Sequence, residues 1–244
     1  MSLCVVIPAR NEEKLLQRCL HALADQSDPV DEIIVVDNDS SDGTAAAARS
    51  HAGVVVVAEP RHGITYARNT GFNAATAALI ARIDADTIVT PAWAGAIRRA
   101  FLTDPELAGL AGPAGFTRLS SGDRVVGRAT YRVFRAVHEA MIGSGPVMYG
   151  HNMALRQTAW TRIRDLVTTG DGSISEDLDV TLALLHTGER IAYEPEMLVT
   201  IAVERTLGYR KLAGYHRTNR LTMAKYRDRQ VEAGAARAGR RRPI

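Results

Sequence analysis

Two carboxylates one residue apart, Asp84 and Asp86, follow the mostly apolar segment 79–83. If that run is a buried strand, both side chains lie in the turn that follows it, where they can reach one hard divalent cation. An octahedral Mg²⁺ or Mn²⁺ held there can also take oxygens from a nucleotide diphosphate and neutralise charge on a leaving group. Solvated turn acids produce the same pattern, so the pair by itself leaves both interpretations open.

Asp37 is a second candidate, because it ends the apolar run 33–36 and precedes the polar turn 38–43. Helix capping and turn chemistry explain Asp42 within that turn. A carboxylate at the last position of a strand can instead accept hydrogen bonds from a ribose or from a base N–H. By position alone, Asp37 fits a turn residue and a ligand residue equally well.

Glu176 and Asp177 follow Ser175 at the start of a segment that we expect to be helical over 178–186. Ser175 can cap this helix, and acids are favourable near a helix N-terminus. The alternative is a general base, since a carboxylate near a metal site can deprotonate an incoming hydroxyl. The residues alone do not decide between these roles.

Polar residues inside two other segments complete the set of candidates. Arg68 lies one turn into a helix expected near 66–78, where it can bind a base or diphosphate or tie the helix to the Asp-rich loops. His151 and Asn152 interrupt the apolar run 147–155. A lone histidine in such a run is more often hydrogen-bonded packing than catalysis.

The elements that must position these residues alternate between strand and helix in the first half. Continuous apolar runs, typical of strands buried on both faces, occur at 3–7, 33–36 and 54–57, and a fourth strand is expected at 79–83. Helices are expected between them at 15–23, 44–50 and 66–78. The alternation predicts an α/β fold with a doubly wound, mostly parallel sheet, whose ligands gather at the carboxyl ends of the strands.

The second half of the chain is less regular. We expect a helix near 93–101, a strand at 107–111, an amphipathic stretch at 124–141 and extended segments at 147–155 and 189–203. The whole predicts one domain over 1–228 and a basic, disordered tail over 229–244.

Composition and missing motifs exclude several classes. With 244 residues, 46% hydrophobic and 23% charged, the chain is neither disordered nor collagen-like nor a coiled coil. Two cysteines suit a reducing compartment and give no disulfide framework or zinc cluster. A P-loop, a Gly-x-Gly-x-x-Gly after the first strand and a Gly-x-Ser-x-Gly elbow are all absent, which argues against P-loop hydrolysis, dinucleotide redox chemistry and esterase activity.

Charge is distributed unevenly along the chain. Residues 1–205 hold 19 basic and 25 acidic side chains, net −6, whereas 206–244 hold 11 basic and 2 acidic ones, net +9. A basic segment can hold a protein at an anionic leaflet, at about 1 kcal/mol per Lys or Arg near the surface, or can simply solubilise it. Nucleic-acid binding fits less well, because the body is acidic and no aromatic platform is interleaved with the arginines. No apolar run reaches the ~18 residues of a membrane span, so we expect a cytoplasmic protein, free or peripheral on the inner face of the cell membrane.

In order along the chain, these motifs resemble the family-2 glycosyltransferases, inverting enzymes with the nucleotide-diphosphosugar fold called GT-A. The matching segments are 5–13, 34–44, 67–71, the Asp-x-Asp at 84–86, 150–156 and 175–177. The resemblance covers about residues 3 to 200 and implies a nucleotide-sugar-binding half over 1–112 and an acceptor-side half over 113–228.

The resemblance also implies roles for individual residues. Asp177 would be the general base, with Glu176 as its rival, and Mg²⁺ or Mn²⁺ would be the cofactor. Nucleotide-sugar binding would fall to Pro8, Ala9, Glu12, Asp37, Arg68, Asp84, Asp86 and Asn152. Asp84 and Asp86 would hold the metal as well, and His216 could complete its shell or lie on a solvated helix face.

The implied reaction is the inverting transfer of a single sugar from a UDP- or GDP-sugar to an unidentified hydroxyl or lipid-phosphate acceptor, as in glycan or glycolipid biosynthesis. The chain departs from processive members in lacking their Gln-x-x-Arg-Trp motif, with 215–220 in its place, and their long transmembrane portion. A nucleotidyltransferase on a similar fold is the nearest enzymatic alternative, but its Gly-rich loop is missing. From another class, the alternatives are a catalytically silent nucleotide-sugar binder and a membrane-associated interaction protein.

Overall fold

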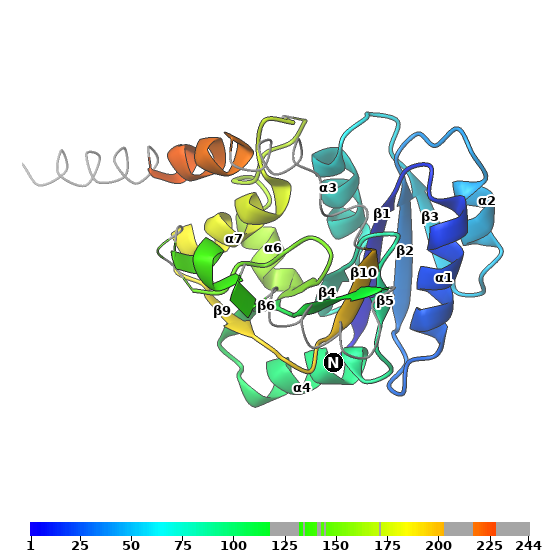
Figure 1. The fold of residues 1–244 in the computed structure, drawn as a ribbon, viewed down its shortest axis with the longest axis horizontal. Helices are drawn as coiled ribbons and strands as arrows, with labels where there is room; N and C mark the ends of the chain where they lie inside the picture. The colour runs from blue at the N-terminus through cyan, green and yellow to red at the C-terminus, as the bar shows by residue number, and fades with distance from the viewer. Residues whose placement is uncertain are drawn as a thin grey trace, which may run out of the picture.

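The computed structural model describes residues 1–117, 132–133, 135–140, 143, 145–170, 172–202 and 217–227. Helices lie on both faces of a central sheet, with α1 and α2 at one end of the molecule and α6 and α7 toward the other (Figure 1). The helix over 217–227 lies at the periphery, beyond α7 (Figure 1). The expected amphipathic stretch 124–141 falls largely outside the described residues, and the tail 229–244 and His216 fall wholly outside them.

The first half of the chain alternates strand and helix, as the hydrophobic runs predicted. Its elements are β1 (Leu3–Ala9), α1 (Glu13–Ala24), β2 (Glu32–Asp37), α2 (Thr44–Arg49), β3 (Val54–Ala58), α3 (Ile64–Ala74) and β4 (Leu79–Arg82). Each strand matches an apolar run to within two residues at either end, because strands covered on both faces need no polar alternation.

The later elements are shorter. They are β5 (Ile88–Val89), α4 (Trp93–Thr103), β6 (Leu107–Ala111), β7 (Ala114–Thr117), β8 (Met153–Arg156), α6 (Gln157–Ile163), α7 (Glu176–His186), β9 (Arg190–Tyr193) and β10 (Val199–Ala202). The prediction of a continuous extended segment over 147–155 was wrong, since only its end forms a strand. The segment 189–203 contains two separate strands, and β5, β7 and α6 were not foreseen.

Seven strands form the main sheet in the order β3-β2-β1-β4-β8-β6-β9, and β5-β10-β7 form a small second sheet. The β3-β2-β1-β4 part is parallel, which confirms the mostly parallel α/β fold. β8 runs antiparallel to both of its neighbours. The amino end of β8 therefore meets the carboxyl ends of β1, β2 and β4 at one edge of the sheet.

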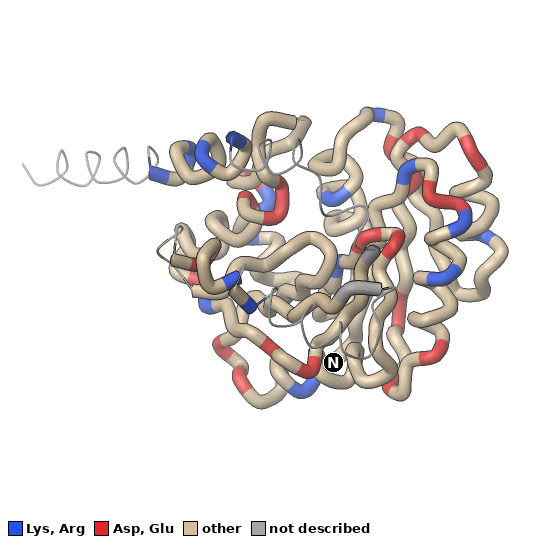
Figure 2. Tube along the Cα trace, viewed as in Figure 1, with Lys and Arg blue, Asp and Glu red and all other residues tan. Residues whose placement is uncertain are grey.

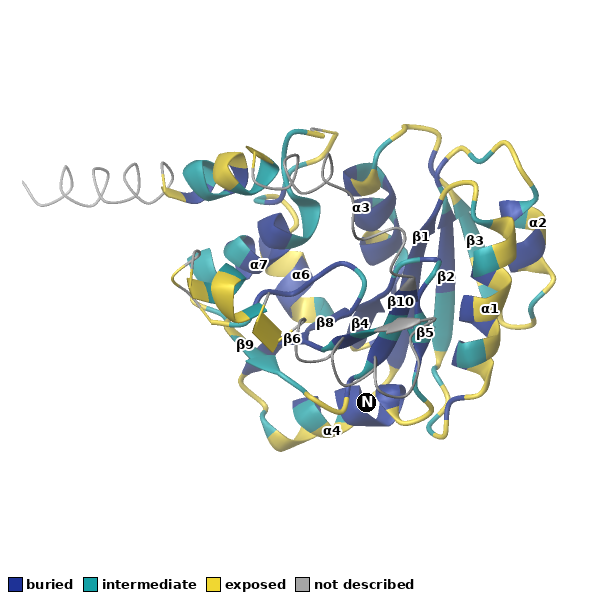
Figure 3. Cartoon of the chain, in the orientation of Figure 1, coloured by how far each residue is buried: buried dark blue, intermediate teal, exposed yellow. Residues whose placement is uncertain are grey.

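The strand β1 is buried along its length (Figure 3), and its alternate residues enter two different cores. Leu3, Val5 and Ile7 of β1 pack in a core with α1 and α4. Cys4 and Val6 point to the opposite face and pack in a core with α3, α6 and α7. This period of two anchors β1 in the centre of the sheet and leaves only its carboxyl end next to polar residues.

Among the described residues, no helix is both long enough and apolar enough to cross a bilayer. The helix over 217–227 carries basic side chains and no acidic one (Figure 2). Whether the basic region contacts a membrane stays a prediction, as do the domain bounds drawn from the sequence.

Candidate active site

The candidate site begins at the carboxyl ends of β2, β1 and β4. Ala9 of β1 pairs with Asp37 of β2, and Val6 pairs with Arg82, the last residue of β4. Asp84 and Asp86 follow β4 at the same edge, as the strand pattern predicted. Pro8 and Ala9 are buried, so in this conformation a nucleotide would meet their backbone and not their side chains.

Two polar turns are tied together beside Asp37. Asn11 accepts a hydrogen bond from the Ser41 amide at 2.8 Å, and the Asn11 amide donates to Ser40 Oγ at 3.1 Å. Asn11 and Asp39 have φ of 55° and 57°, a left-handed conformation that Asn and Asp tolerate better than most residues. The Asp37 carboxylate accepts a bond from the Ser40 amide at 3.2 Å. The turn therefore presents Asp37 at the strand edge in a fixed position.

Glu12 lies at the start of α1 in the first of these turns. Its amide donates to Thr44 Oγ1 at 2.8 Å, which joins the beginnings of α1 and α2. The carboxylate of Asp42 accepts a bond from the Thr44 amide at 2.9 Å, so Asp42 fulfils the capping role expected of it. Glu12 is partly exposed beside the strand edge.

Asp84 is held by an arginine that sequence reasoning missed. The side chain of Asp84 is 42% exposed, and its Oδ1 lies 2.9 Å from Nη2 of Arg82. Burial raises the pKa of the Cys19 thiol of α1, and the nearby Asp86 and Asp84 raise it further. Both acids of the pair therefore lie close to α1, at the same edge as Pro8 and Ala9.

Glu176 begins α7 and joins the same charge cluster. Its Oε1 lies 2.5 Å from Nη1 of Arg82, and its Oε2 lies 3.7 Å from Nη1 of Arg68. Burial raises the pKa of the Glu176 carboxyl, whereas the positive charge of Arg82 opposes that rise. Glu176 is thus a buried counter-ion between two arginines. An arginine within the apolar run 79–83 was the one signal that could have revealed this bridge.

Asp177, the next residue, is held differently. Its Oδ1 accepts bonds from Ser175 Oγ and from the Leu178 amide, each at 2.8 Å. Its Oδ2 accepts a 3.3 Å bond from the Gly150 amide. Ser175 does not cap α7 with its side chain but orients Asp177 instead. All partners of Asp177 named here are neutral donors, unlike those of Glu176.

Arg68 does not reach the open edge in this conformation. The side chain is 0% exposed, and its guanidinium donates to the carbonyl oxygens of Glu176 at 2.5 Å and Thr168 at 3.1 Å. The structure therefore favours the structural alternative, an arginine that ties α3 to the loop before α7. A contact between Arg68 and a nucleotide is not supported here, because the carbonyl groups of that loop already hold the guanidinium.

Asn152 is also an interior residue, contrary to the expectation that it binds the donor. Its Nδ2 donates to the carbonyl oxygens of Pro113 at 2.8 Å and Met197 at 2.6 Å, and its Oδ1 accepts a bond from Trp93 Nε1 at 2.9 Å. The side chain is fully buried. With its amide bonds satisfied within the fold, Asn152 joins the segment before β8 to α4 and β10.

His151 connects the acidic cluster to an aromatic side chain. Its ring stacks on Tyr149, with centroids 5.6 Å apart. Burial lowers the pKa of His151, Asp84 and Asp177 oppose the shift, and Arg82 reinforces it. Asp84 and Asp177 both act on His151, and Arg82 joins Asp84 to Glu176, so the structure brings together Asp84, Glu176 and Asp177, with Asp86 two residues beyond Asp84 in the same turn.

The side chains at this edge supply some of the ligands that a hard divalent cation needs. The described residues contain no group of three or more His, Cys, Asp or Glu side chains arranged to hold a metal. Asp84 and Asp86 supply two carboxylates, and Mg²⁺ is commonly bound through one or two carboxylates together with substrate phosphates and water. The expected third ligand, His216, lies outside the described residues.

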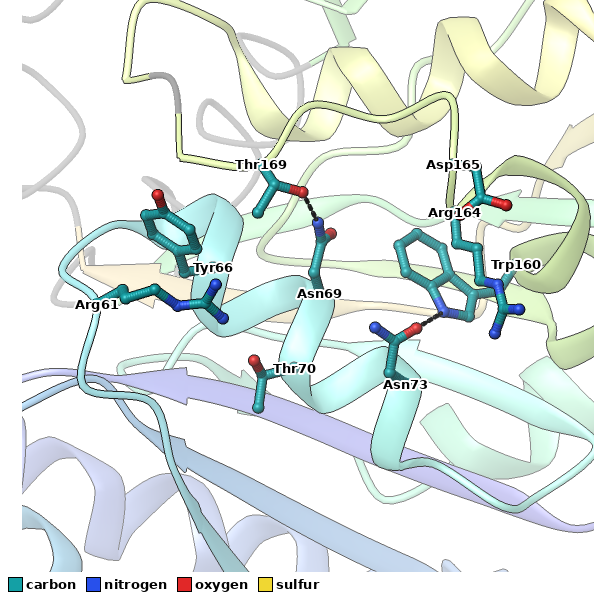
Figure 4. Close-up of a pocket in the computed structure, with 9 residues that line it drawn as sticks. All are labelled: Arg61, Tyr66, Asn69, Thr70, Asn73, Trp160, Arg164, Asp165 and Thr169. Atoms are coloured by element: carbon teal, nitrogen blue, oxygen red, sulfur yellow. Dashed lines mark hydrogen bonds between the residues drawn. The ribbon is translucent and has the colours of Figure 1, made fainter.

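A pocket of about 350 Å³ lies on the outer side of α3, between this helix, α6 and the segment 164–169 (Figure 4). Asn69 donates to Thr169 at 2.7 Å and Trp160 donates to Asn73 at 2.8 Å along its wall (Figure 4). None of the expected site residues lines it. Arg68 lies between the wall of this pocket and the acidic cluster, since its Nε donates to Asn69 Oδ1 at 2.9 Å and its Nη1 donates to the Glu176 carbonyl oxygen.

Solved structures share this fold. A glucosyl-3-phosphoglycerate synthase from Mycobacterium tuberculosis, in complex with Mn²⁺, uridine-diphosphate-glucose and phosphoglyceric acid, is 20% identical, with a TM-score of 0.69 over 92% of this chain and 79% of its own. The mannosyltransferase PcManGT from Pyrobaculum calidifontis, in complex with GDP-Man and Mn²⁺, is 22% identical, with a TM-score of 0.64 over 96% of this chain and 75% of its own. These likenesses establish the fold, and together with the strand-edge acids they define a protein of the GT-A class.

Sequence similarity assigns the chain to a family. Residues 4–159 match the model of Glycosyl transferase family 2, and the chain belongs to that family. It is 34% identical over 96 residues to the glycosyltransferase AglE of Haloferax volcanii, a match that covers 36% of this chain and 32% of the relative. It is 41% identical over 90 residues to a 4,4'-diaponeurosporenoate glycosyltransferase of Staphylococcus aureus, covering 35% of this chain and 24% of the relative. These matches therefore span about a third or less of the relatives' length.

Proposed function

We propose that this protein is an inverting, metal-dependent glycosyltransferase that transfers one sugar from a UDP- or GDP-sugar to a hydroxyl or lipid-phosphate acceptor. The observation that carries the proposal is the bridge from Asp84 through Arg82 to Glu176, with distances of 2.9 and 2.5 Å. It joins the acids of the strand edge to the acids of α7 in one cluster. A nucleotide sugar bound at the strand-edge acids would therefore have its sugar beside the acids of α7.

Donor binding falls to the edge formed by β2, β1 and β4. Asp37 is placed to accept hydrogen bonds from a nucleoside, with the backbone of Pro8 and Ala9 and the side chain of Glu12 beside it. The fold neighbours that contain uridine-diphosphate-glucose or GDP-Man with Mn²⁺ support a nucleotide sugar and a divalent cation for this chain. Asp84 and Asp86 would hold Mg²⁺ or Mn²⁺, which supplies charge neutralisation for the leaving diphosphate when bound.

Asp177 is the better of the two candidates for the general base. Glu176 is 12% exposed and spans two guanidinium groups, so a proton on it would break an ion pair. Asp177 instead receives only hydrogen bonds from neutral groups, which orient the carboxylate and leave its charge uncompensated by a direct ion pair. Its Oδ2, with the longer 3.3 Å bond from Gly150, is the oxygen proposed to take the proton.

The proposed step is a single displacement. Asp177 accepts the proton of the acceptor hydroxyl as that oxygen attacks the anomeric carbon, and the bond from this carbon to the diphosphate oxygen breaks on the opposite face. The configuration of the sugar is inverted. Glu176 and Arg82 keep the helix start and the strand edge in register during this exchange, so the reacting groups need not be reorganised.

A lipid-linked acceptor is compatible with the basic C-terminal region. The described part of that region, 217–227, contributes Arg and Lys side chains without an acid, as expected for contact with an anionic leaflet (Figure 2). The role proposed for this region is peripheral attachment.

The test combines the full chain with Mn²⁺ and a panel of UDP- and GDP-sugars and measures nucleoside diphosphate release. We expect release with wild type and a loss of about 10³ in rate for Asp86→Ala, because the cation and the diphosphate lose a ligand. Asp28→Ala, at the opposite edge of the sheet, is the matched control and should keep its rate. Binding of a nucleotide sugar without any turnover would favour a silent binder, and no binding at all would reject the proposal.

A further inference from the structure

Arg82 occupies an unusual position for an arginine. It ends β4, pairs with Val6 of β1 on one side and Met153 of β8 on the other, and its side chain is 2% exposed. Its two terminal nitrogens donate to different carboxylates, Nη2 to Asp84 Oδ1 at 2.9 Å and Nη1 to Glu176 Oε1 at 2.5 Å. Its Nε is buried without a hydrogen-bond partner.

This arrangement costs free energy that an apolar side chain at the end of β4 would not. Burying a guanidinium requires desolvation that an apolar side chain of similar volume avoids, and the unpartnered Nε adds to the cost. The other interior positions of the same run, Leu79, Ile80 and Ala81, are apolar. Arg82 is the one charged residue among these strand positions, which indicates that its charge has a function beyond packing.

The surroundings of Arg82 are shaped to accommodate it. Gly150 lies against the guanidinium, and a Cβ at this position would overlap the terminal nitrogens. The Gly150 amide donates to Asp177 Oδ2 at 3.3 Å. One glycine therefore covers Arg82 and contacts the proposed base, so the end of β4, the start of α7 and the turn before β8 meet at this side chain.

We propose that Arg82 is a positioning residue, which fixes Asp84 and Glu176 relative to each other and acts as the internal counter-ion that limits how strongly the cluster binds a divalent cation. The inference rests on the proposed function. Three carboxylates, those of Asp84, Glu176 and Asp177, surround the Arg82 guanidinium, which contacts the first two directly and is affected by the charge of the third. Without Arg82 this cluster would be more negative and would attract a divalent cation more strongly.

Arg82 also engages one oxygen of Asp84. Oδ1 is bonded to the guanidinium, whereas Oδ2 has no hydrogen bond within the described part of the chain. Arg82 thus competes with a cation for Asp84 while holding the carboxylate in place. Removal of the guanidinium would strengthen cation binding and weaken catalysis, and a residue that only stabilises the fold would not produce this pair of effects.

The experiment titrates the donor-free full chain with Mn²⁺ by calorimetry and measures turnover with the nucleotide sugar that the wild type uses. For Arg82→Met we expect a Mn²⁺ Kd lower by about tenfold, because one positive charge has left the cluster, and a turnover lower by about 10² because the bridge is lost. Arg82→Lys restores the charge but not the two-pronged geometry. Its Mn²⁺ Kd should stay within about threefold of wild type while turnover remains about tenfold down.

Arg98→Met is the matched control. Arg98 also bridges two carboxylates, Asp28 and Asp31, at 2.7 Å each, but near the amino end of β1. It should alter neither Mn²⁺ affinity nor turnover. An unchanged or weaker Mn²⁺ affinity in Arg82→Met, beside a wild type that binds Mn²⁺, would overturn the inference while leaving the proposed function intact. If Arg82→Met does not fold, turnover of Arg82→Lys within twofold of wild type would overturn it. A wild type that binds neither Mn²⁺ nor any nucleotide sugar would reject both.

Discussion

Two regions of the chain present their acids in different ways. In the first half of the chain, Asp37 and Asp84 stand at strand ends, and the side chain of Asp84 is 42% exposed. In the second half of the chain, Glu176 is 12% exposed and lies between buried arginines. The first arrangement leaves carboxylates available to a ligand, and the second fixes them before a ligand arrives. The comparison suggests that the first half determines donor affinity and the second determines the rate of the chemical step.

Asp177→Asn tests this division most strongly. Turnover should fall by about 10² or more because the proton acceptor is lost, whereas donor affinity should change by only a few fold. Steady-state kinetics with donor binding measured separately would check both. Asp37→Asn should show the reverse, with weaker donor binding and nearly normal turnover. Retained turnover in Asp177→Asn would move the base role to Glu176 or elsewhere.

Asp179→Ala tests how much a buried ion pair in the second half of the chain contributes to stability. Asp179 is fully buried, lies 2.7 Å from Lys225 Nζ and also accepts bonds from Tyr226 and Thr168. Its removal takes one buried acceptor from each of these donors and should lower the free energy of unfolding by about 3 kcal/mol. Urea denaturation measures the change. The matched control is Asp104→Ala, whose pair with Arg190 is solvent-exposed and should contribute less than about 1 kcal/mol.

Gly71→Ala probes the apolar packing of the first half. A Cβ at Gly71 would lie 2.9 Å from Val36 Cγ2 and closer still to Val6, so α3 would have to move away from the sheet. We expect a loss of about 2 kcal/mol in the free energy of unfolding from overpacking. Gly145→Ala, where a Cβ meets nothing within 4 Å, should be nearly neutral. Equal stability of the two variants in thermal unfolding would show that α3 packs more loosely than described.

The last expected effect depends on pH and concerns Glu59 of the first half. Hydrogen bonds from Arg61, opposed by burial and assisted by Thr70, lower the pKa of Glu59 from 4.5 to about 2. Because the folded pKa is the lower one, the stabilisation is complete above about pH 4.5 and is lost as the pH falls toward 2. Glu59→Gln should remove this part of the pH dependence. Urea denaturation of both proteins between pH 2.5 and 6 would test it, and parallel stability profiles would contradict the assignment.

The sequence predicted the first half of the fold better than the second. The runs that became β1, β2 and β4 are largely apolar because they lie inside the sheet, and the edge strand β3, whose Val55 is 51% exposed, is a run of valines. This local signal needs no knowledge of distant partners. β8 was harder to foresee, since only the four residues Met153–Arg156 pair, and they do so antiparallel to β4 and β6. The strands β5 and β7 are short, and they form strands only because they pair with β10, which lies more than 80 residues away in the chain.

The candidate site residues were also predicted with mixed success. Asp37, Asp84 and Asp86 were placed correctly at one edge, because strand ends of a parallel sheet share a direction. Asn152 and Arg68 were expected at the donor, but their buried amide and guanidinium groups bind backbone carbonyls inside the fold. The sequence signal for a polar residue in an apolar run is the same for a ligand contact and for an interior hydrogen bond.

What the sequence determined by itself was the alternating framework and the order of its acidic turns, since hydrophobic periodicity and strand direction are local properties of the chain. Only the tertiary structure decided which acids meet which arginines. The pairing of Arg82 with both Asp84 and Glu176 joins residues 94 positions apart. An ion pair of that kind depends on burial and on the distance between the two charges, and neither exists until the sheet and α7 have packed together.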